Sequence, residues 1–337
     1  MLILRKFLRS ILFCSSTKIS TFEPIILKYF PMFIEQAIKK DNKFWKYLIG
    51  SIFVILASSL AQIPLILAVF LSPNTTNLAQ LSTTDILNVL DSNLSLFLMS
   101  LTFVGGIIGL YFVVKWIHKQ SLRSLINPFG SIRWSRFFFA FGLWASVVVF
   151  TTSLDYLLRP TDYVFNLNWP SFILLVLVAG VMLPLQTSCE ELIFRGYLMQ
   201  GFGNLAGNKW FPLLMTSLIF GGMHILNPEV EKMGYSILIY YIGTGLLLGI
   251  FTLLDDGIEL AMGFHAANNL IGALLVTSSW SVFQTHSILK DVSEPEIGFD
   301  VLLPVFIIYP LILLVLRKKY KWTNWKEKLT GKFTLPN

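Results

Sequence analysis

Apolar segments long enough to cross a lipid bilayer recur along the whole sequence. A transmembrane helix needs about 20 consecutive, mostly apolar residues. Hydrophobic residues make up 55% of the 337 residues, charged residues make up 13%, and the mean hydropathy is +0.68. Soluble domains contain about 25% charged residues, so this composition excludes an ordinary soluble domain. The sequence therefore predicts an all-α fold, a polytopic transmembrane helix bundle.

We predict about eight spans in a single membrane domain. They cover residues 47–72, 95–116, 137–154, 171–190, 211–227, 235–254, 257–277 and 301–317. The chain then divides into a basic amphipathic cytoplasmic leader (1–46), a membrane-embedded domain (47–317) and a basic cytoplasmic tail (318–337). A signal peptide is the alternative for the first 16 residues, but its apolar core around residues 11–14 is short.

The Lys and Arg residues predict the orientation, because short cytoplasmic loops collect them. With the amino terminus in the cytoplasm, 23 of the 26 Lys and Arg residues lie in cytoplasmic segments, and Arg159, Lys232 and Lys290 lie outside. We therefore expect both termini in the cytoplasm. In a soluble protein the net charge of +7 would suggest nucleic acid. Here the basic residues flank spans, so we expect membrane lipids and no nucleic acid as partners.

Two adjacent carboxylates, Glu190 and Glu191, and the nearby Arg195 follow an apolar run. An ionisable residue at membrane depth is costly and marks a functional site by default. Residues on a helix advance about 100° each, which places Arg195 about 40° from Glu191 and about 140° from Glu190. Arg195 is therefore predicted to neutralise Glu191. Glu190 needs a partner from another helix.

The four histidines fall into two groups. His118 and His286 lie in loops, where we expect solvated side chains. His224 and His265 lie inside predicted spans. Intramembrane His and Asn side chains often form hydrogen bonds between helices, which is the structural interpretation of each taken alone.

Helical spacing groups the intramembrane polar residues on shared faces. Phe220 precedes His224 by four residues, and the glycines between them permit close approach. His265 and Asn269 are also four residues apart. Glu190, two histidines and an amide together suit hydrolysis of an amide. Glu190 would serve as general base, His224 would orient water or protonate the leaving amine, and His265 with Asn269 would stabilise an oxyanion.

Three short motifs built from these residues also carry a family resemblance. Glu190-Glu191-x-x-x-Arg195, Phe220-x-x-x-His224 and His265-x-x-x-Asn269, in this order, resemble the three motifs of the CPBP family. That family includes the CAAX prenyl proteases of type II and bacteriocin-processing enzymes, and its members are also called Abi proteins. The resemblance covers about residues 170–280, and no motif residue departs from the pattern.

The resemblance implies an intramembrane endopeptidase with an eight-helix fold. In such an endopeptidase, the position matching Glu190 activates water and the position matching His224 assists. The positions matching His265 and Asn269 form an oxyanion site. Glu191, Arg195 and Phe220 would support these residues structurally. It implies a peptide or protein substrate, either prenylated or a leader peptide. The short loops resemble those of bacterial members, so we expect a bacterial plasma membrane.

A metal cofactor is left open at this stage. The family is commonly labelled as metalloprotease, and Glu190, His224 and His265 would supply three ligands to zinc or another divalent metal. The sequence contains no His-Glu-x-x-His on one helix, and a glutamate that acts as base is not at the same time a simple ligand. Glutamate-activated water without a metal is the favoured mechanism.

The predicted spans place Glu190 and His224 at depths that differ by about 10 Å, at about 1.5 Å per residue. A break at Pro184, with residues up to Gly203 turned back into the membrane, would reconcile them. Two other functions are kept as hypotheses. A proton-coupled transporter uses similar intramembrane carboxylates, but the sequence shows no inverted repeat. A non-catalytic membrane scaffold would use the polar residues only to join helices.

Overall fold

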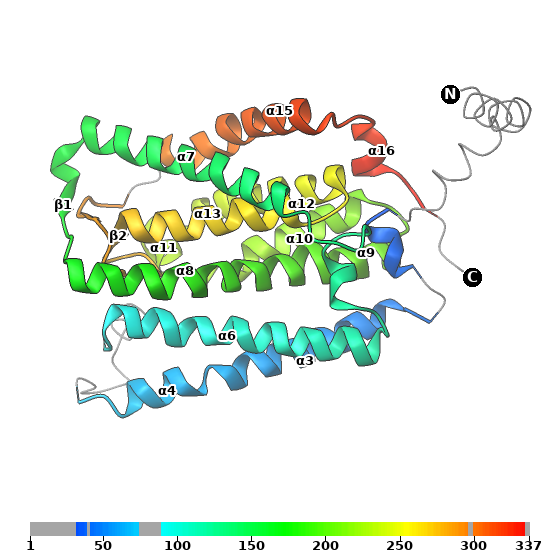
Figure 1. Ribbon diagram of the computed structural model, residues 1–337, viewed down its shortest axis with the longest axis horizontal. Helices are drawn as coiled ribbons and strands as arrows, with labels where there is room; N and C mark the ends of the chain where they lie inside the picture. The colour runs from blue at the N-terminus through cyan, green and yellow to red at the C-terminus, as the bar shows by residue number, and fades with distance from the viewer. Residues whose placement is uncertain (1–31, 39–40, 74–88, 296–298, 334–337) are drawn as a thin grey trace, which may run out of the picture.

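Long helices account for most of the chain in this computed structural model, which describes residues 32–38, 41–73, 89–295 and 299–333 (Figure 1). The α-helices are α3 (Phe44–Ala61), α4 (Ile63–Phe70), α6 (Ser92–Phe112), α7 (Trp134–Leu158), α8 (Trp169–Glu191), α9 (Met199–Ala206), α10 (Trp210–Met223), α11 (Pro228–Met233), α12 (Leu238–Asp255), α13 (Glu259–Leu275), α14 (Phe299–Leu303), α15 (Tyr309–Tyr320) and α16 (Trp325–Thr330). π-Helical segments at Val113–Ile117, Leu192–Leu198 and Pro304–Ile308 extend or join some of them.

Each of the eight predicted spans corresponds to a helix in the described residues, and the helix bundle is confirmed. Six helices are long and apolar enough to cross a membrane: Phe44–Phe70, Ser92–Ile117, Trp134–Leu158, Trp169–Ala206, Tyr235–Asp255 and Val301–Tyr320. The fifth predicted span is the shorter α10, with 14 residues. The seventh is α13, with 17 residues and several polar side chains. Both short helices carry predicted site residues.

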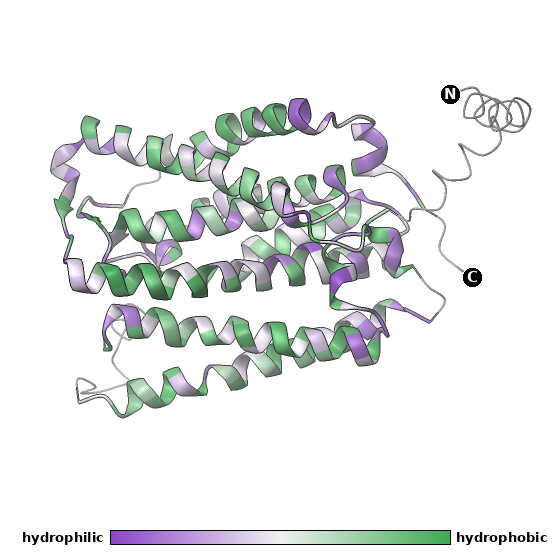
Figure 2. Cartoon of the chain, viewed as in Figure 1, coloured by the Kyte–Doolittle hydropathy of each residue, from purple (hydrophilic) through white to green (hydrophobic). Residues whose placement is uncertain are grey.

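The outer helices present apolar side chains outward. Ile52, Phe53 and Ile55 of α3 are each more than half exposed, as are Leu157 of α7 and Leu177 of α8. Hydrophobic residues dominate the middle of these helices, and hydrophilic residues gather toward both ends of the bundle (Figure 2). Large exposed side chains of this kind are expected where lipid tails surround a protein.

Helix α13 lies inside the bundle. It packs against α7, α8 and α12, and nearly all of its first half is buried. Gly263 lets it approach α7 closely, because a Cβ there would lie 2.1 Å from the carbonyl oxygen of Phe137. Its polar side chains therefore face other helices rather than lipid.

The fourth predicted span is longer than the sequence suggested. The predicted break at Pro184 is wrong, since α8 passes through this proline to Glu191. The backbone changes later, at the π-helical segment Leu192–Leu198, and continues as α9 to Ala206. The whole helix has 38 residues, so it is about 57 Å long at about 1.5 Å per residue.

This extension removes the predicted difference in depth between Glu190 and His224. The helix continues from Glu190 to Ala206, or about 24 Å at about 1.5 Å per residue. Helix α10 then begins at Trp210 and reaches His224 after about 21 Å at the same rise. The predicted end of the span at residue 190 was wrong, because the charged residues there lie within the bundle instead of at its surface.

A small sheet joins the connections at the end of the bundle opposite α9 (Figure 1). Its strands β1 (Tyr163–Phe165), β2 (Val276–Ser278) and β3 (Leu289–Asp291) have the order β1-β3-β2. β3 pairs antiparallel with β1 and parallel with β2. The all-α prediction did not include these strands, which link the α7–α8 connection to the segment after α13.

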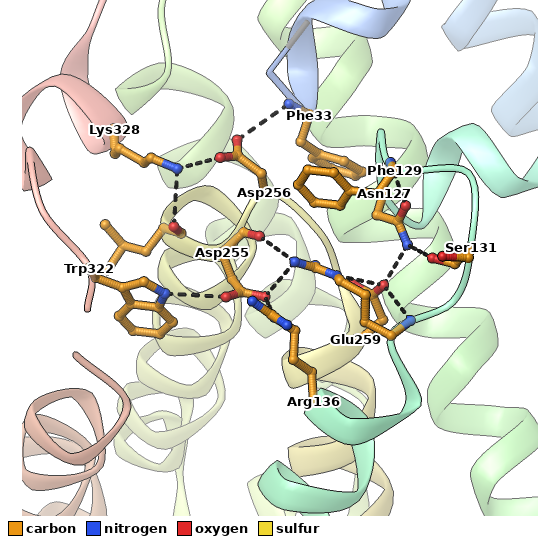
Figure 3. A network of polar contacts seen from close by, with 12 residues as sticks. Phe33, Asn127, Phe129, Ser131, Arg136, Asp255, Asp256, Glu259, Trp322 and Lys328 are labelled. Carbon is orange, nitrogen blue, oxygen red and sulfur yellow. Dashed lines mark hydrogen bonds and ion pairs between the residues drawn. The ribbon is translucent and has the colours of Figure 1, made fainter. Parts of the chain in front are cut away.

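A buried ion network holds the opposite end, where α12 leads into α13 (Figure 3). Arg133 binds Asp255 at 3.0 Å and Glu259 at 2.5 Å, and Arg136 binds Asp255 at 2.6 Å. Trp322 donates its indole Nε1 proton to Asp255 at 3.2 Å. The loop charges that indicated topology in the sequence therefore also fasten the start of α7 to α12 and α13.

The predicted leader lies mostly outside the described residues. Its described part includes a short helical turn, Ile34–Ala37, with Phe33 and Ile34 each only 1% exposed. The predicted tail forms α16 on the same end of the bundle, where Lys328 binds Asp256. The backbone amide of Phe33 donates to the other carboxylate oxygen of Asp256 at 3.5 Å, so both segments contact the α12–α13 loop.

Candidate active site

The predicted pair of Glu191 and Arg195 is present in the bundle interior. Arg195 Nη1 lies 2.8 Å from Glu191 Oε1, and both side chains are completely buried. Arg195 Nη2 also donates to the carbonyl oxygen of Gly245 on α12 at 3.2 Å. The π-helical segment that carries Arg195 is thereby fixed to α12 at the same time as it neutralises Glu191.

His265 of α13 joins the first and third motifs. Its Nδ1 lies 2.8 Å from Glu191 Oε1, the oxygen that also binds Arg195. Its Nε2 lies 3.8 Å from Glu190 Oε2. A carboxylate oxygen only accepts, so Nδ1 carries the proton in this contact. The ring is therefore held between the two glutamates.

Glu190 lacks the close cationic partner that Glu191 has. Gln186, one turn earlier on α8, donates to Glu190 Oε1 over 3.4 Å, which is long for a hydrogen bond. The Glu190 side chain is 14% exposed, whereas that of Glu191 is 0% exposed. The two adjacent carboxylates thus have different surroundings, as the helical spacing predicted.

Phe220 brings the second motif against the other two. The Arg195 guanidinium lies 4.4 Å from the centroid of the Phe220 ring, within the range of a cation–π contact. The Phe220 ring also meets His265 edge to face at 5.8 Å and His224 at 4.8 Å. Phe220 is 2% exposed, so it fills the space between these three side chains.

His224 lies where α10 ends, and its ring is fixed from two sides. Nδ1 lies 2.7 Å from the carbonyl oxygen of Phe220, and the ring stacks on Tyr241 of α12 at 4.2 Å. A carbonyl oxygen only accepts, so Nδ1 carries the proton and Nε2 of the neutral ring is an acceptor. A Cβ at Gly222, two residues earlier, would meet no atom within 4 Å.

Asn269, the last predicted site residue, contacts a residue that the motifs do not include. Asn268 Nδ2 donates to Asn269 Oδ1 at 3.1 Å. Asn268 Oδ1 in turn accepts from Trp144 Nε1 at 3.0 Å and from the Tyr240 hydroxyl at 3.3 Å. Asn269 lies one turn beyond His265 on α13, and among the described residues it makes no hydrogen bond to Glu190 or His224.

Close helix contacts allow this assembly. A Cβ at Gly245 would lie 3.0 Å from the Cα of Ser217 on α10. A Cβ at Gly221 would lie 2.3 Å from a side-chain carbon of Ile242 on α12. Glycines at both positions let α10 and α12 pack closely, so that Arg195 reaches the Gly245 carbonyl.

His118 supports the π-helical segment from outside the motifs. Its Nε2 lies 3.0 Å from the Tyr197 hydroxyl, and its Nδ1 contacts Asn42 Oδ1 at 2.5 Å. It is 7% exposed, so the expected solvated position is wrong. Burial, with a smaller effect of the charge on Lys46, lowers the pKa of His118 to about 4. The histidine is therefore neutral near pH 7.

A zinc site of the kind left open by the sequence needs three protein ligands that converge on one point. In the described ranges no group of three or more His, Cys, Asp or Glu side chains is arranged to hold a metal ion. Glu190, His224 and His265 therefore do not fit the three-ligand site that the sequence left open.

Comparisons with known proteins identify the family of this chain. Residues 166–271 match the family model of the type II CAAX prenyl endopeptidases, Rce1-like. The chain is 30% identical over 251 residues to the uncharacterized protein YyaK of Bacillus subtilis (strain 168), an alignment that covers 73% of this chain and 82% of YyaK. No solved structure matches. The matched range holds every motif residue, from Glu190 to Asn269, and the chain belongs to the Rce1-like family of type II CAAX prenyl endopeptidases, which are integral membrane proteases.

Proposed function

We propose that the protein is an intramembrane endopeptidase that hydrolyses a peptide bond with water activated by Glu190. The observation that carries the proposal is the difference between the two adjacent glutamates. Glu191 is paired with Arg195 at 2.8 Å, whereas Glu190 is partly exposed and 3.8 Å from His265. A carboxylate without a close cation is free to accept a proton, which is what a general base requires.

Glu190 takes a proton from water as the water oxygen bonds to the substrate carbonyl carbon. The carbonyl oxygen then becomes an oxyanion. When this intermediate collapses, the carbonyl bond reforms, the carbon–nitrogen bond breaks, and Glu190 returns the proton to the leaving amine. No covalent enzyme intermediate is needed, consistent with the burial of the neighbouring Cys189.

His265 and Asn269 are the proposed donors to the oxyanion. The Nδ1 proton of His265 is directed at Glu191, so Nε2 is the nitrogen left for substrate. Nε2 donates to an oxyanion only when it carries a proton in addition to the one on Nδ1. Asn269 contributes its amide from the next turn of α13. Donors of this kind act on the charge that develops in the transition state.

His224 is the proposed water-orienting residue. Its Nδ1 proton is directed at the Phe220 carbonyl, so the neutral ring offers Nε2 as an acceptor. An acceptor holds the second proton of the attacking water while Glu190 removes the first. This geometry favours orientation of water over proton donation to the leaving amine, the other role expected from the sequence.

The proposed substrate is a peptide segment that enters the bundle from the membrane. A prenylated carboxyl-terminal motif and a leader peptide are the two substrate classes to compare. We also propose a plasma membrane location with both described end segments on the cytoplasmic side. Lys328 and the backbone amide of Phe33 both bind Asp256 in the α12–α13 loop, which supports a common side for these segments.

The test is cleavage of quenched fluorescent peptides by the detergent-purified full chain. The panel contains a farnesylated CAAX peptide, the same peptide without lipid, and a leader peptide. Glu190→Gln should remove turnover while the melting temperature stays near that of the wild type. Asp155→Asn is the matched control. It removes one carboxylate near the carboxyl-terminal end of α7 and should keep turnover. Equal cleavage by wild type and Glu190→Gln would refute the proposal.

A further inference from the structure

Asn268, which the family motifs do not include, has a hydrogen-bonding pattern that fixes the direction of its amide. The Trp144 indole nitrogen is a donor only, so the atom of Asn268 that faces it must be the oxygen. That contact is 3.0 Å long. The Tyr240 hydroxyl donates to the same oxygen at 3.3 Å. With its oxygen held by two donors, Asn268 presents its Nδ2 group on the other side.

The amide direction of Asn268 determines that of Asn269. Asn268 Nδ2 lies 3.1 Å from Asn269 and can only donate. Asn269 must therefore turn its oxygen toward Asn268, which directs its own Nδ2 away. Within the described part of the chain that Nδ2 has no hydrogen-bond partner. It is the atom that an oxyanion donor needs.

The two groups that hold Asn268 come from different helices. Trp144 of α7 is 4% exposed, and its ring stacks on Phe264 at a centroid distance of 4.1 Å. Tyr240 of α12 lies near Tyr309, whose hydroxyl bonds Thr244 at 2.8 Å. The donors are thus set by packing outside the motif residues. Such support fixes a catalytic group in one of its possible directions.

We propose that Asn268 is a positioning residue, which directs the amide donor of Asn269 toward the oxyanion through a relay from Trp144 and Tyr240. This inference rests on the proposed function, because it gives Asn269 an orientation that only the oxyanion role uses. Without the relay, the amide of Asn269 can turn over and present its oxygen, which repels an oxyanion.

Asn268→Asp is the decisive variant. Aspartate keeps the oxygen that accepts from Trp144 and Tyr240, but it cannot donate to Asn269. Asn269 then turns its Nδ2 toward the new carboxylate. We expect kcat for the best-cleaved peptide of the panel to fall about 100-fold with KM within about twofold, as for loss of one oxyanion donor. Trp144→Phe combined with Tyr240→Phe should lower kcat in the same way, because Asn268 is then free to turn.

A double-mutant cycle separates positioning from a structural effect or from the added charge. Asn269→Ala should itself lower kcat, and Asn268→Asp should cause no further loss in the Asn269→Ala protein. Equal losses in both backgrounds would overturn the relay while leaving the proposed function intact. Full activity of Asn269→Ala would instead refute the oxyanion role.

A second measurement needs no substrate. In the full chain labelled with ¹⁵N-asparagine, hydrogen exchange at the Asn268 side-chain amide should be slow and that at Asn269 fast. In Asn268→Asp the Asn269 amide should become slow, because it then donates to the carboxylate. Fast exchange at Asn268 in the wild type, or an unchanged Asn269 in the variant, would contradict the inference.

Discussion

One carboxylate oxygen of Glu191 is shared by Arg195 Nη1 and His265 Nδ1, each at 2.8 Å. The other oxygen, Oε2, is buried with no hydrogen-bond partner among the described residues. Glu191 thus joins a cation on the π-helical segment to a histidine on α13. Its charge therefore holds Arg195 and His265 in place.

Replacing Glu191 by Leu should destabilise the protein strongly. The Arg195 charge would then be buried with no carboxylate at its side, which costs about 3–5 kcal/mol. The double variant Glu191→Leu with Arg195→Met should lose less than the sum of the two single variants. Thermal unfolding in detergent measures all three proteins. Additive losses would show that the pair is not coupled.

Replacing Gly245 by Val should separate α10 from α12. The new Cβ would lie 3.0 Å from the backbone of Ser217, so the helices must move, at a cost of about 1–3 kcal/mol. The movement shifts the carbonyl that binds Arg195, so kcat should fall together with the melting temperature. Gly180→Ala is the control, since a Cβ there meets no atom within 4 Å. It should leave the melting temperature unchanged or raise it.

The stability of the protein should decrease as the pH falls toward 4. The pKa of His118 is about 4 in the folded protein, below the ordinary value of about 6.5. Between these values the unfolded chain binds more protons than the folded one, so stability rises with pH across this window. Melting temperatures at pH 4.5 and pH 7 should differ more in the wild type than in His118→Gln. Equal differences would exclude His118 as the titrating group.

Cysteine labelling should report opposite sides for the two ends of the bundle. In a Cys14→Ser and Cys189→Ser background, Thr323→Cys and Lys290→Cys each place one thiol at an exposed position. With the predicted orientation, a membrane-impermeant maleimide added to intact bacterial cells should label the Lys290 variant and spare the Thr323 variant. Labelling of the Thr323 variant alone would reverse the orientation.

Much of the bundle follows from sequence because apolar length and helical spacing are local properties. The eight helices and the pairing of Glu191 with Arg195 are of this kind. The position at which the fourth span ends is not such a local property. Glu190 and Glu191 indicated a membrane boundary, whereas they lie about 24 Å before the end of the helix, at about 1.5 Å per residue.

Asn268 and His118 could not be assigned from spacing, because their partners are distant in the chain. Trp144 precedes Asn268 by 124 residues, and Tyr197 follows His118 by 79 residues. A donor such as the Trp144 indole in a predicted span is a signal that a polar acceptor lies opposite, but it does not name the acceptor. The π-helical turn gives no such signal, since its residues also suit an α-helix.

The helix that carries Glu190 contains the π-helical segment Leu192–Leu198. The number of residues in this segment therefore affects the geometry of the site. A π turn holds one more residue than the α turn it replaces. Deleting one residue from this segment would leave an uninterrupted α-helix, and the side chains of the π turn would move to other faces of that helix. Arg195 and Tyr197 would then leave their contacts with Gly245 and His118, although every motif residue would still be present. Homologous chains of this kind should therefore be compared residue by residue across this turn, since a gap of one position there changes the site without changing its composition.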